Sequence, residues 1–332
     1  MKKTTFFQLL GGLILAGVGL YIFFSGVKIP ELLNQIHSIP WWAITGVVLL
    51  TFLSLWLRSV RWNLILPQSP FASRRDLFGI IMIAFMVNNI LPARLGEAAR
   101  MLLLWKRNKF TAAESIGSVL LERFLDSIVF LSFFFIPAFF MPQLREALPF
   151  ARPLACGVSA VCITLVSYAF FPVKVRSLSK SLLMFFPSKL QHRVLTIGKE
   201  LISNLDWIFS LKKCLFMLFL SFCIVACHAA MMMILAREAS FGFLSGMFGA
   251  AWAALGAAIP FSPGYVGTLH AALKHGLVMT GCGAAKAAAV ATIYHAIGYL
   301  TVTIFGLVFI IKMRISFKDI GRAKEELEKE DS

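Results

Sequence analysis

The sequence predicts an all-α integral membrane protein that crosses the bilayer several times. Apolar residues make up 59% of the 332 residues and charged residues only 14%, whereas a soluble domain carries about 25% charged residues. The apolar residues also form uninterrupted blocks, and residues 6–26 contain no charge at all. The longest stretch between blocks, 173–213, is too short for a soluble enzyme domain. We therefore expect a membrane protein without a catalytic domain.

Six blocks have the length of full spans, since about 18 apolar residues suffice to cross the hydrocarbon core as a helix. Their predicted ranges are 6–26, 41–60, 115–141, 153–172, 214–235 and 286–311. The first block follows Lys2 and Lys3. It is too long for a cleavable signal peptide and has no small-x-small cleavage site, so we expect it to be retained.

Two further apolar stretches, 77–91 and 243–259, are shorter than a span. The first would be only about 22 Å long as a helix. Each ends in residues that break a helix and is followed by a second helical stretch, near 95–107 and 266–280. A short helix, a break and a return helix indicate a re-entrant hairpin, whose irregular backbone needs cover from protein or from a wet cavity.

Basic residues set the expected orientation. Lys and Arg outnumber Asp and Glu by 32 to 16, and most of them flank apolar blocks, where they mark cytoplasmic loops. We expect both termini and the segment 173–213 to be cytoplasmic in a bacterial inner membrane, and the loops 142–152 and 236–242 to face outward. Nucleic acid is not an expected partner, because no basic patch is interleaved with aromatic residues.

These expectations combine into one membrane domain, residues 1–312, with a charged cytoplasmic tail at 313–332. All basic regions share one side only if each broken hairpin returns to the side from which it entered. The domain then consists of two inverted units, roughly 1–141 and 153–312, joined by the outer loop 142–152. Inverted repeats with broken helices at the midplane are a recurrent transporter design. The alternative is eight plain spans with kinks.

The first candidate site is the stretch from Asn88 and Asn89 to Arg100. Arg94, Glu97 and Arg100 recur every three residues, so they occupy neighbouring positions on the return helix. Charges near membrane depth persist mainly when they are paired or line a polar pathway. Because Glu97 can neutralise only part of this positive charge, the excess and the free N–H groups of the helix start predict an anion site. The alternative is a surface salt bridge in a cytoplasmic loop.

A second cluster lies in the third full span, where Glu122, Arg123 and Asp126 interrupt an apolar block. Glu122 and Asp126 are four residues apart and share one helix face. Two buried carboxylates require cations, and the structural alternative is a clamp between span and hairpin. A hydrolase with paired carboxylates is not expected, because nearby arginines favour charge balance over acid catalysis. The candidate cations are Arg58, Arg61, Arg94 and Arg100.

The third candidate site is the second break and the helix after it. Its residues are Pro263, Gly264, Gly267, His270 and Lys274. Residues 241–311 contain no acidic side chain, and a cation without a local carboxylate suits a ligand that brings its own negative charge. The alternatives are that Lys274 snorkels to the interface and that His270 is a hydrogen-bonded core residue.

The cysteines lie mostly inside apolar blocks and form no C-x-x-C pair. Cys223, Cys227 and His228 could share part of a helix face, but no fourth ligand is near them. We therefore expect packing roles, without a metal ion or another cofactor.

Four motifs together resemble one family. They are Arg58-x-x-Arg61-Trp62, Asn89-x-x-Pro92-Ala93-Arg94-x-Gly96-Glu97-x-x-Arg100, Glu122-Arg123-x-x-Asp126 and Pro260-x-x-Pro263-Gly264-x-x-Gly267. In these motifs the chain resembles the flippase-like family of the lysylphosphatidylglycerol synthase transmembrane region, over nearly its whole length. The resemblance implies a membrane region that moves lipid between leaflets, with aminoacyl transfer left to a separate soluble domain.

Two departures from the family pattern bear on the cargo. The soluble synthase domain is absent from this sequence, so we do not expect the chain to make lysyl lipid. The family usually has an acidic residue shortly after the second break, where this chain has His270. This difference favours an anionic or polyprenyl-phosphate-linked lipid over a cationic aminoacyl lipid.

The sequence therefore predicts a lipid translocase or lipid-binding transporter, in which Arg94, Arg100 and Lys274 hold a phosphate while acyl chains stay in the bilayer. The alternatives are a secondary transporter of small anionic solutes, with Glu122 or Asp126 as a proton site, an accessory subunit of envelope-lipid synthesis and, most weakly, an intramembrane enzyme. The expected partner is a phospholipid or a polyprenyl-phosphate lipid. A second copy of the chain and a lipid-synthesis enzyme are open alternatives.

Overall fold

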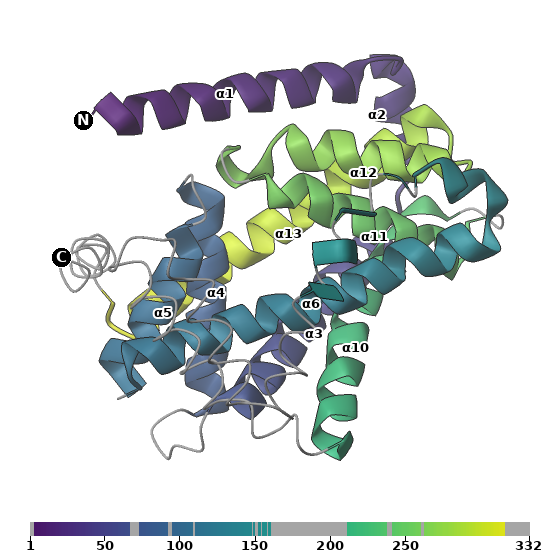
Figure 1. The fold of residues 1–332 in the computed structure, drawn as a ribbon. Coiled ribbons are helices and arrows are strands. Elements are labelled where there is room, and N and C mark those ends of the chain that lie inside the picture. The colour runs from purple at the N-terminus through teal and green to yellow at the C-terminus, as the bar shows by residue number, and fades with distance from the viewer. Residues whose placement is uncertain are drawn as a thin grey trace.

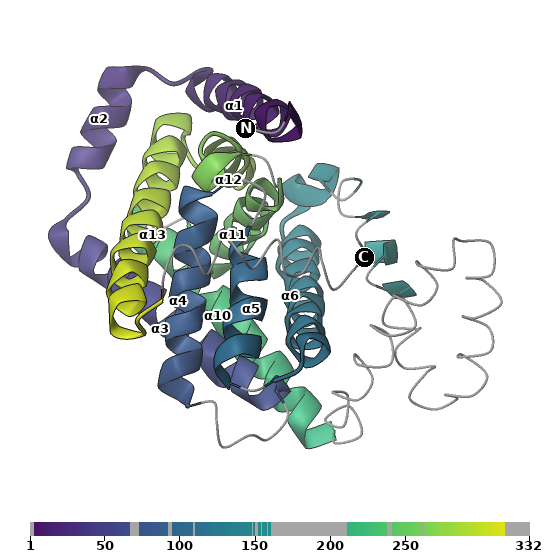
Figure 2. The same ribbon diagram turned by 90° about the vertical axis from the view of Figure 1, so that its left-hand side faces the viewer.

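The computed structural model describes residues 3–315, except 67–72, 92–94, 109, 148, 150, 151, 154, 158, 161–210, 238–240, 260 and 261. Most of the predicted span 153–172, nearly all of the basic segment 173–213, and Arg94 thus lie outside the described residues. The described ranges form α-helices and two short 3-10 helices (Figures 1 and 2). This architecture confirms the all-α class.

Three helices in the described ranges are long and apolar enough to cross a membrane. They are α3 (Trp41–Ile65), α10 (Leu211–Ala236) and α13 (Ala284–Lys312), and each matches a predicted span. A fourth span results if the bent pair α1 (Lys3–Phe24) and α2 (Ile29–His37) counts as one, with 84° between its halves. The chain is therefore a multi-pass membrane protein.

The charged helix α6 (Ala112–Phe140) has 29 residues and covers the predicted span 115–141. Thr111 caps its start, because the Thr111 hydroxyl accepts from the Glu114 N–H and the Glu114 carboxylate accepts from the Thr111 N–H. This capping box fixes where the helix begins. The 3-10 helix η1 (Pro142–Ala147) follows its other end.

Both predicted hairpins form helix–break–helix pairs. The first pair is α4 (Arg74–Ile90) with α5 (Leu95–Asn108), and the second is α11 (Phe243–Ala258) with α12 (Thr268–Met279). The partners within each pair pack directly on one another (Figure 2). Glycine allows this closeness in the first pair, since a Cβ on Gly96 would lie 1.8 Å from the Ala84 carbonyl oxygen. Whether these hairpins are re-entrant stays a prediction.

The breaks of the two hairpins contact each other beside α13. Asn89, near the end of α4, donates to the Tyr299 carbonyl at 3.2 Å and to the Thr303 hydroxyl at 3.1 Å. Gly264, in the 3-10 helix η2 (Pro263–Tyr265), lies against the same place: a Cβ there would be 3.0 Å from the Asn89 carbonyl oxygen. The two hairpin tips, far apart in sequence, thus meet in the fold.

Candidate functional site

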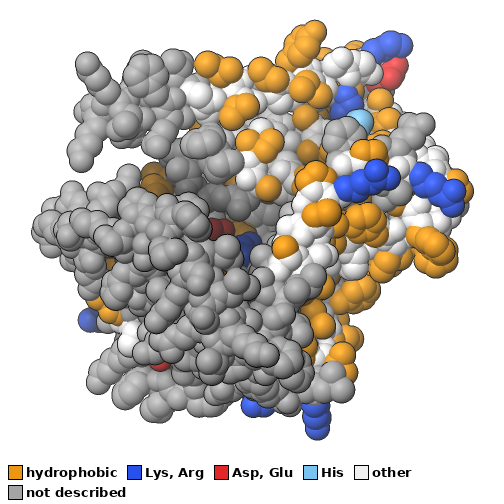
Figure 3. All heavy atoms as spheres, viewed as in Figure 1, with side chains coloured by type: hydrophobic (Ala, Val, Ile, Leu, Met, Phe, Trp, Pro, Cys, Tyr) orange, Lys and Arg blue, Asp and Glu red, His pale blue; other side chains and the backbone are white. Residues whose placement is uncertain are grey.

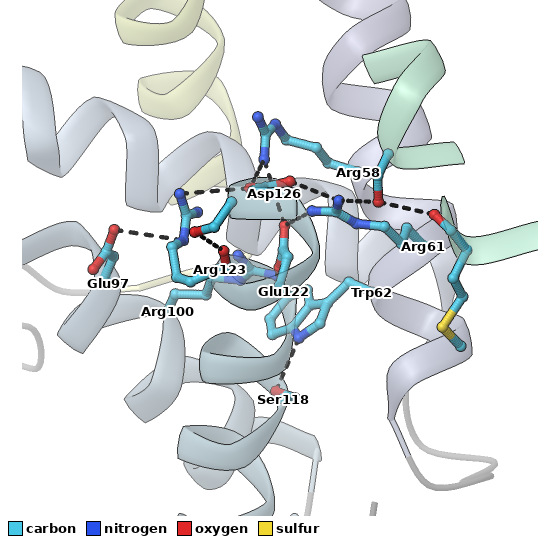
Figure 4. A network of polar contacts seen from close by, with 12 residues as sticks. Arg58, Arg61, Trp62, Glu97, Arg100, Ser118, Glu122, Arg123 and Asp126 are labelled. Carbon is cyan, nitrogen blue, oxygen red and sulfur yellow. Dashed lines mark hydrogen bonds and ion pairs between the residues drawn. The ribbon is translucent and has the colours of Figure 1, made fainter. Parts of the chain in front are cut away.

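Charged side chains of three helices, three of them buried, form one network (Figure 4). Its members are Arg58 and Arg61 from α3, Glu97 and Arg100 from α5, and Glu122, Arg123 and Asp126 from α6. Among the described members, four arginines face three carboxylates, which leaves one more positive than negative charge. The structure thus brings together seven of the residues that the sequence singled out.

Glu122 lies at the centre of this network and is fully buried. Its carboxylate accepts from Arg61 Nη2 at 2.9 Å and from Arg100 Nη2, and Arg58 Nη1 lies 3.6 Å away. A buried charge is tolerated only when it is paired and hydrogen-bonded. Glu122 therefore joins the long helix α3 to the return helix α5 of the first hairpin.

Asp126, one turn further along α6, completes the pairing with α3. It accepts from Arg61 Nη1 at 2.6 Å and from Arg58 Nη1 at 3.0 Å. Arg61 Nη1 also donates to the hydroxyl of Ser221 on α10 at 2.6 Å. The match follows from spacing, because residues three or four apart on facing helices present two charges each to the same seam.

Three side chains that the sequence did not single out as site residues support the network: Trp62, Ser118 and Ser221. The Arg100 guanidinium lies 3.7 Å from the centre of the Trp62 ring, a cation–π contact. Trp62 Nε1 donates to the Ser118 hydroxyl at 3.0 Å. Trp62 could have been found from the sequence, because it directly follows Arg61 in the first motif. No sequence motif marks Ser221.

The sequence paired Glu97 with two cations, Arg94 and Arg100. Arg94 lies outside the described residues, and the structure revises the pairing for Arg100. Arg100 pairs with Glu122, while Glu97 Oε1 lies 3.8 Å from Arg123 Nε. Both Glu97 and Arg123 are partly exposed, at 29% and 37% of the side chain. A tertiary neighbour on α6 thus takes part in neutralising Glu97.

A cavity of about 390 Å³ opens onto this network. Its charged end is formed by Arg58, Glu97, Arg100, Arg123 and Asp126, and Asn88 lies beside them. Figure 3 shows acidic and basic side chains deep in a recess of one face. The opposite walls are apolar, with Phe85, Phe130 and five alanines of α11. The cavity is therefore amphiphilic.

Two arginines at the charged end of the cavity have an N–H group that makes no hydrogen bond in the described structure. The Nε atoms of Arg100 and Arg123 are buried without a hydrogen-bond acceptor in the described structure, and both residues line the cavity. Unsatisfied buried donors are rare and call for a partner such as an unbound ligand. Together with the excess positive charge, they suit an anion.

A second cavity of about 150 Å³ adjoins the first. Both are lined by Arg58, Phe85, His228, Tyr265, Leu269 and Tyr294. The smaller cavity reaches Asn89, His295 and Tyr299, where the hairpin tips meet. Together the two cavities extend from the arginines to the contact between the two hairpin breaks.

The second break is shaped by backbone conformation. Gly264 and Gly267 have φ angles of 56° and 84°, a region that favours glycine. His295 donates through Nε2 to the Gly264 carbonyl at 2.8 Å, and the Gly267 N–H donates to His270 Nδ1 at 3.3 Å. Pro263 begins η2. These predicted site residues fix the backbone conformation of the break and do not line the large cavity. Their neighbours Tyr265 and Leu269 line it.

The expectation that Lys274 faces the same cavity as the arginines is wrong. Its Nζ donates to the carbonyls of Phe23 at 2.8 Å and Ser25 at 2.6 Å, at the end of α1. It lines a separate pocket that includes Tyr21. The physical reason is that the last carbonyls of a helix lack intrahelical donors and carry partial negative charge. Lys274 satisfies them.

Comparison with known proteins places this membrane fold in a family. No curated protein matched the chain. Residues 8–306 match the family described as the lysylphosphatidylglycerol synthase TM region. The matched range includes all seven charged residues of the network and both hairpins. The chain belongs to the lysylphosphatidylglycerol synthase TM region family.

Proposed function

We propose that this protein is a flippase-like lipid translocase or lipid-binding transporter without enzymatic activity. Its cargo is a phosphate-bearing membrane lipid, either an anionic phospholipid or a polyprenyl-linked one. In this proposal the protein lies in a bacterial inner membrane with both termini in the cytoplasm. The two hairpins are re-entrant, and the two units are inverted repeats.

One observation carries the proposal: a single cavity combines a positively charged end with apolar walls. Such a space complements a molecule that is anionic at one end and hydrocarbon at the other. A small hydrophilic anion would gain nothing from Phe85, Phe130 and the alanines of α11. A lipid cargo is therefore favoured over a small anionic solute.

The arrangement suggests how a head group would be held. Arg58, Arg100 and Arg123 line the cavity, and each is only partly neutralised by the carboxylates around it. A phosphate could accept hydrogen bonds from these cavity-lining guanidinium groups, and its charge would offset the excess positive charge. The acyl chains would follow the apolar walls.

The family match agrees with a lipid cargo, because the family is described by the membrane region of a lipid synthase. The contact between the two hairpin tips also fits a transporter, since broken helices usually meet at the binding site of secondary transporters. Oligomerisation or association with a lipid-synthesis enzyme are compatible with the proposal.

The test is lipid movement in reconstituted vesicles. The wild-type protein should move a fluorescent anionic phospholipid faster than a zwitterionic one with the same acyl chains. Arg58→Gln should reduce this preference. The protein should stay folded, because Asp126 retains Arg61 as a partner. Lys28→Gln, which removes an exposed charge paired with Glu31, is the matched control and should change nothing.

Equal rates for the two lipids, unaffected by Arg58→Gln, would overturn the proposal. Transport of a soluble anion that is abolished by Asp126→Asn would then favour the solute transporter.

A further inference from the structure

We propose that His228 is a proton-binding site of the cavity and that a proton is taken up when an anionic head group binds. The inference rests on the proposed function and deepens it, because it assigns a proton as the co-ligand of the lipid phosphate. His228 lies on α10, outside the motifs that carry the family resemblance. It lines both cavities, at the place where they adjoin.

The surroundings of His228 are defined on every helix packed against α10. From α13, the Tyr294 hydroxyl lies 2.9 Å from His228 Nδ1. From α3 and α6, Arg58 and Asp126 line the same cavity and act electrostatically on the imidazole. The remaining neighbour, α11, contains no titratable residue. Tyr265, from the second break, completes the wall.

Charge balance among the protein's own groups favours a neutral imidazole at His228. Asp126 is the acidic residue that acts on His228, and its charge is already shared by Arg58 and Arg61. A buried imidazole is neutral unless a negative charge lies nearby. The Asp126 carboxylate is thus already paired with two arginines and does little to stabilise a positive charge on His228.

An arriving phosphate changes this balance. It adds a negative charge to a cavity that Arg58 and His228 line together, and it competes with Asp126 for Arg58. Both effects stabilise an imidazolium at His228. Tyr294 can accept from a protonated Nδ1, so the proton has a hydrogen-bond acceptor in place. Proton and anion therefore bind cooperatively, and the coupling is reciprocal.

The sign of the pH effect follows. Binding of an anion whose own charge is constant should tighten as pH falls, because protonation of His228 adds a positive charge to the site. A phosphodiester such as phosphatidylglycerol meets this condition. We expect its affinity to rise about tenfold as the pH falls from neutral to about pH 4, while the charge of the phosphodiester stays constant.

The experiment uses full-length protein in detergent and short-chain phosphatidylglycerol as the probe. Calorimetric titrations in buffers of different ionisation enthalpy measure the protons taken up with each lipid. Wild type should take up a fraction of a proton, up to about one per lipid. His228→Gln should bind with no proton uptake and an affinity independent of pH. Tyr294→Phe should reduce the uptake.

The matched control is His275→Gln, since His275 is an exposed histidine on α12 that lines the separate pocket near Lys274. It should behave as wild type. Unchanged proton uptake in His228→Gln, or none in wild type despite clear binding, would overturn the inference while leaving the proposed function intact. No binding of phosphatidylglycerol by wild type at any pH would instead remove the proposed function as well.

Discussion

The two hairpins reach the same shape by different physical means. The first hairpin, residues 74–108, carries eight charged residues, while the second, residues 243–279, carries only Lys274. The return helix α5 of the first is tied to α6 by ion pairs of Arg100 and Glu97, and to α3 by the contact of Arg100 with the Trp62 ring. The second is held by hydrogen bonds between histidine side chains and the backbone, by left-handed glycines and by close helix packing.

The difference predicts which substitutions each hairpin tolerates. Charged pairs inside a membrane protein are costly and are retained mainly for a functional purpose. The first hairpin contributes Glu97 and Arg100 to the charged end of the cavity. The second hairpin supplies the smooth apolar wall, through the alanines of α11. If this division is right, charge substitutions should matter most in the first hairpin and steric substitutions most in the second.

The largest effect is expected at the centre of the first hairpin's network. Glu122→Gln would leave Arg61 and Arg100 without their shared carboxylate in a fully buried place. Removing one partner of a buried ion pair costs about 3–5 kcal/mol. Thermal unfolding in one detergent should show a large loss of stability. Glu31→Gln, at an exposed pair, is the control. Similar shifts for both variants would contradict the buried network.

The next effect should be steric and lie in the second hairpin. A Cβ on Gly267 would lie 2.3 Å from the Ala16 carbonyl oxygen of α1, and its φ is 84°. Gly267→Ala should cost about 1–3 kcal/mol through strain, and more through displacement of α1. Gly281→Ala isolates the strain, because its φ is 95° and its Cβ would meet nothing within 4 Å. Equal losses in thermal stability would mean that α1 does not dock there.

Lys274→Met should have a smaller effect of a different kind. It removes the donors that hold the carbonyls at the end of α1, at about 0.5–1.5 kcal/mol per hydrogen bond. Stability should fall, while the preference for anionic over zwitterionic lipid in reconstituted vesicles stays unchanged. Loss of the preference for anionic lipid would mean that Lys274 does take part in binding the head group. Lys28→Met is the control for removal of a lysine charge.

The smallest effect is expected for Glu97→Gln, at the partly exposed edge of the network. Ion pairs that are accessible to solvent contribute only about 0–1 kcal/mol. A double-mutant cycle with Arg123→Gln, read by thermal unfolding, should give a coupling within that range. A loss as large as that of Glu122→Gln would show that the cavity is closed to water.

Much of the site could be predicted from spacing alone. Arg58 and Arg61 are three apart, and Glu122 and Asp126 are four apart, so each pair had to share a helix face. Two buried carboxylates require cations, and the sequence left Arg58, Arg61, Arg94 and Arg100 as candidates. Of these, the structure places Arg58, Arg61 and Arg100 against Glu122 and Asp126. Asn89 and Gly264 were likewise predicted at hairpin tips, and the tips meet there.

Other features could not be read from spacing, because they depend on which helices become neighbours. Lys274 lies in a segment without acidic residues, and its partners are backbone carbonyls that every helix end possesses. Nothing in the sequence marks the end of α1 as the one it meets. His228 looked like a packing residue until the fold placed it beside Tyr294 and Arg58.

The sequence by itself determined the membrane class, the helical segments, the two breaks and the faces on which charges lie. These follow from local quantities: the length of apolar blocks, the 3.6-residue period, and the conformational limits of proline and glycine. Only the tertiary structure decided that Glu97 pairs with Arg123, that Lys274 caps α1, and that the arginines open onto an apolar cavity. Those outcomes depend on long-range packing, where many helix surfaces compete for the same neighbour and the best-packed arrangement with its buried charges satisfied prevails.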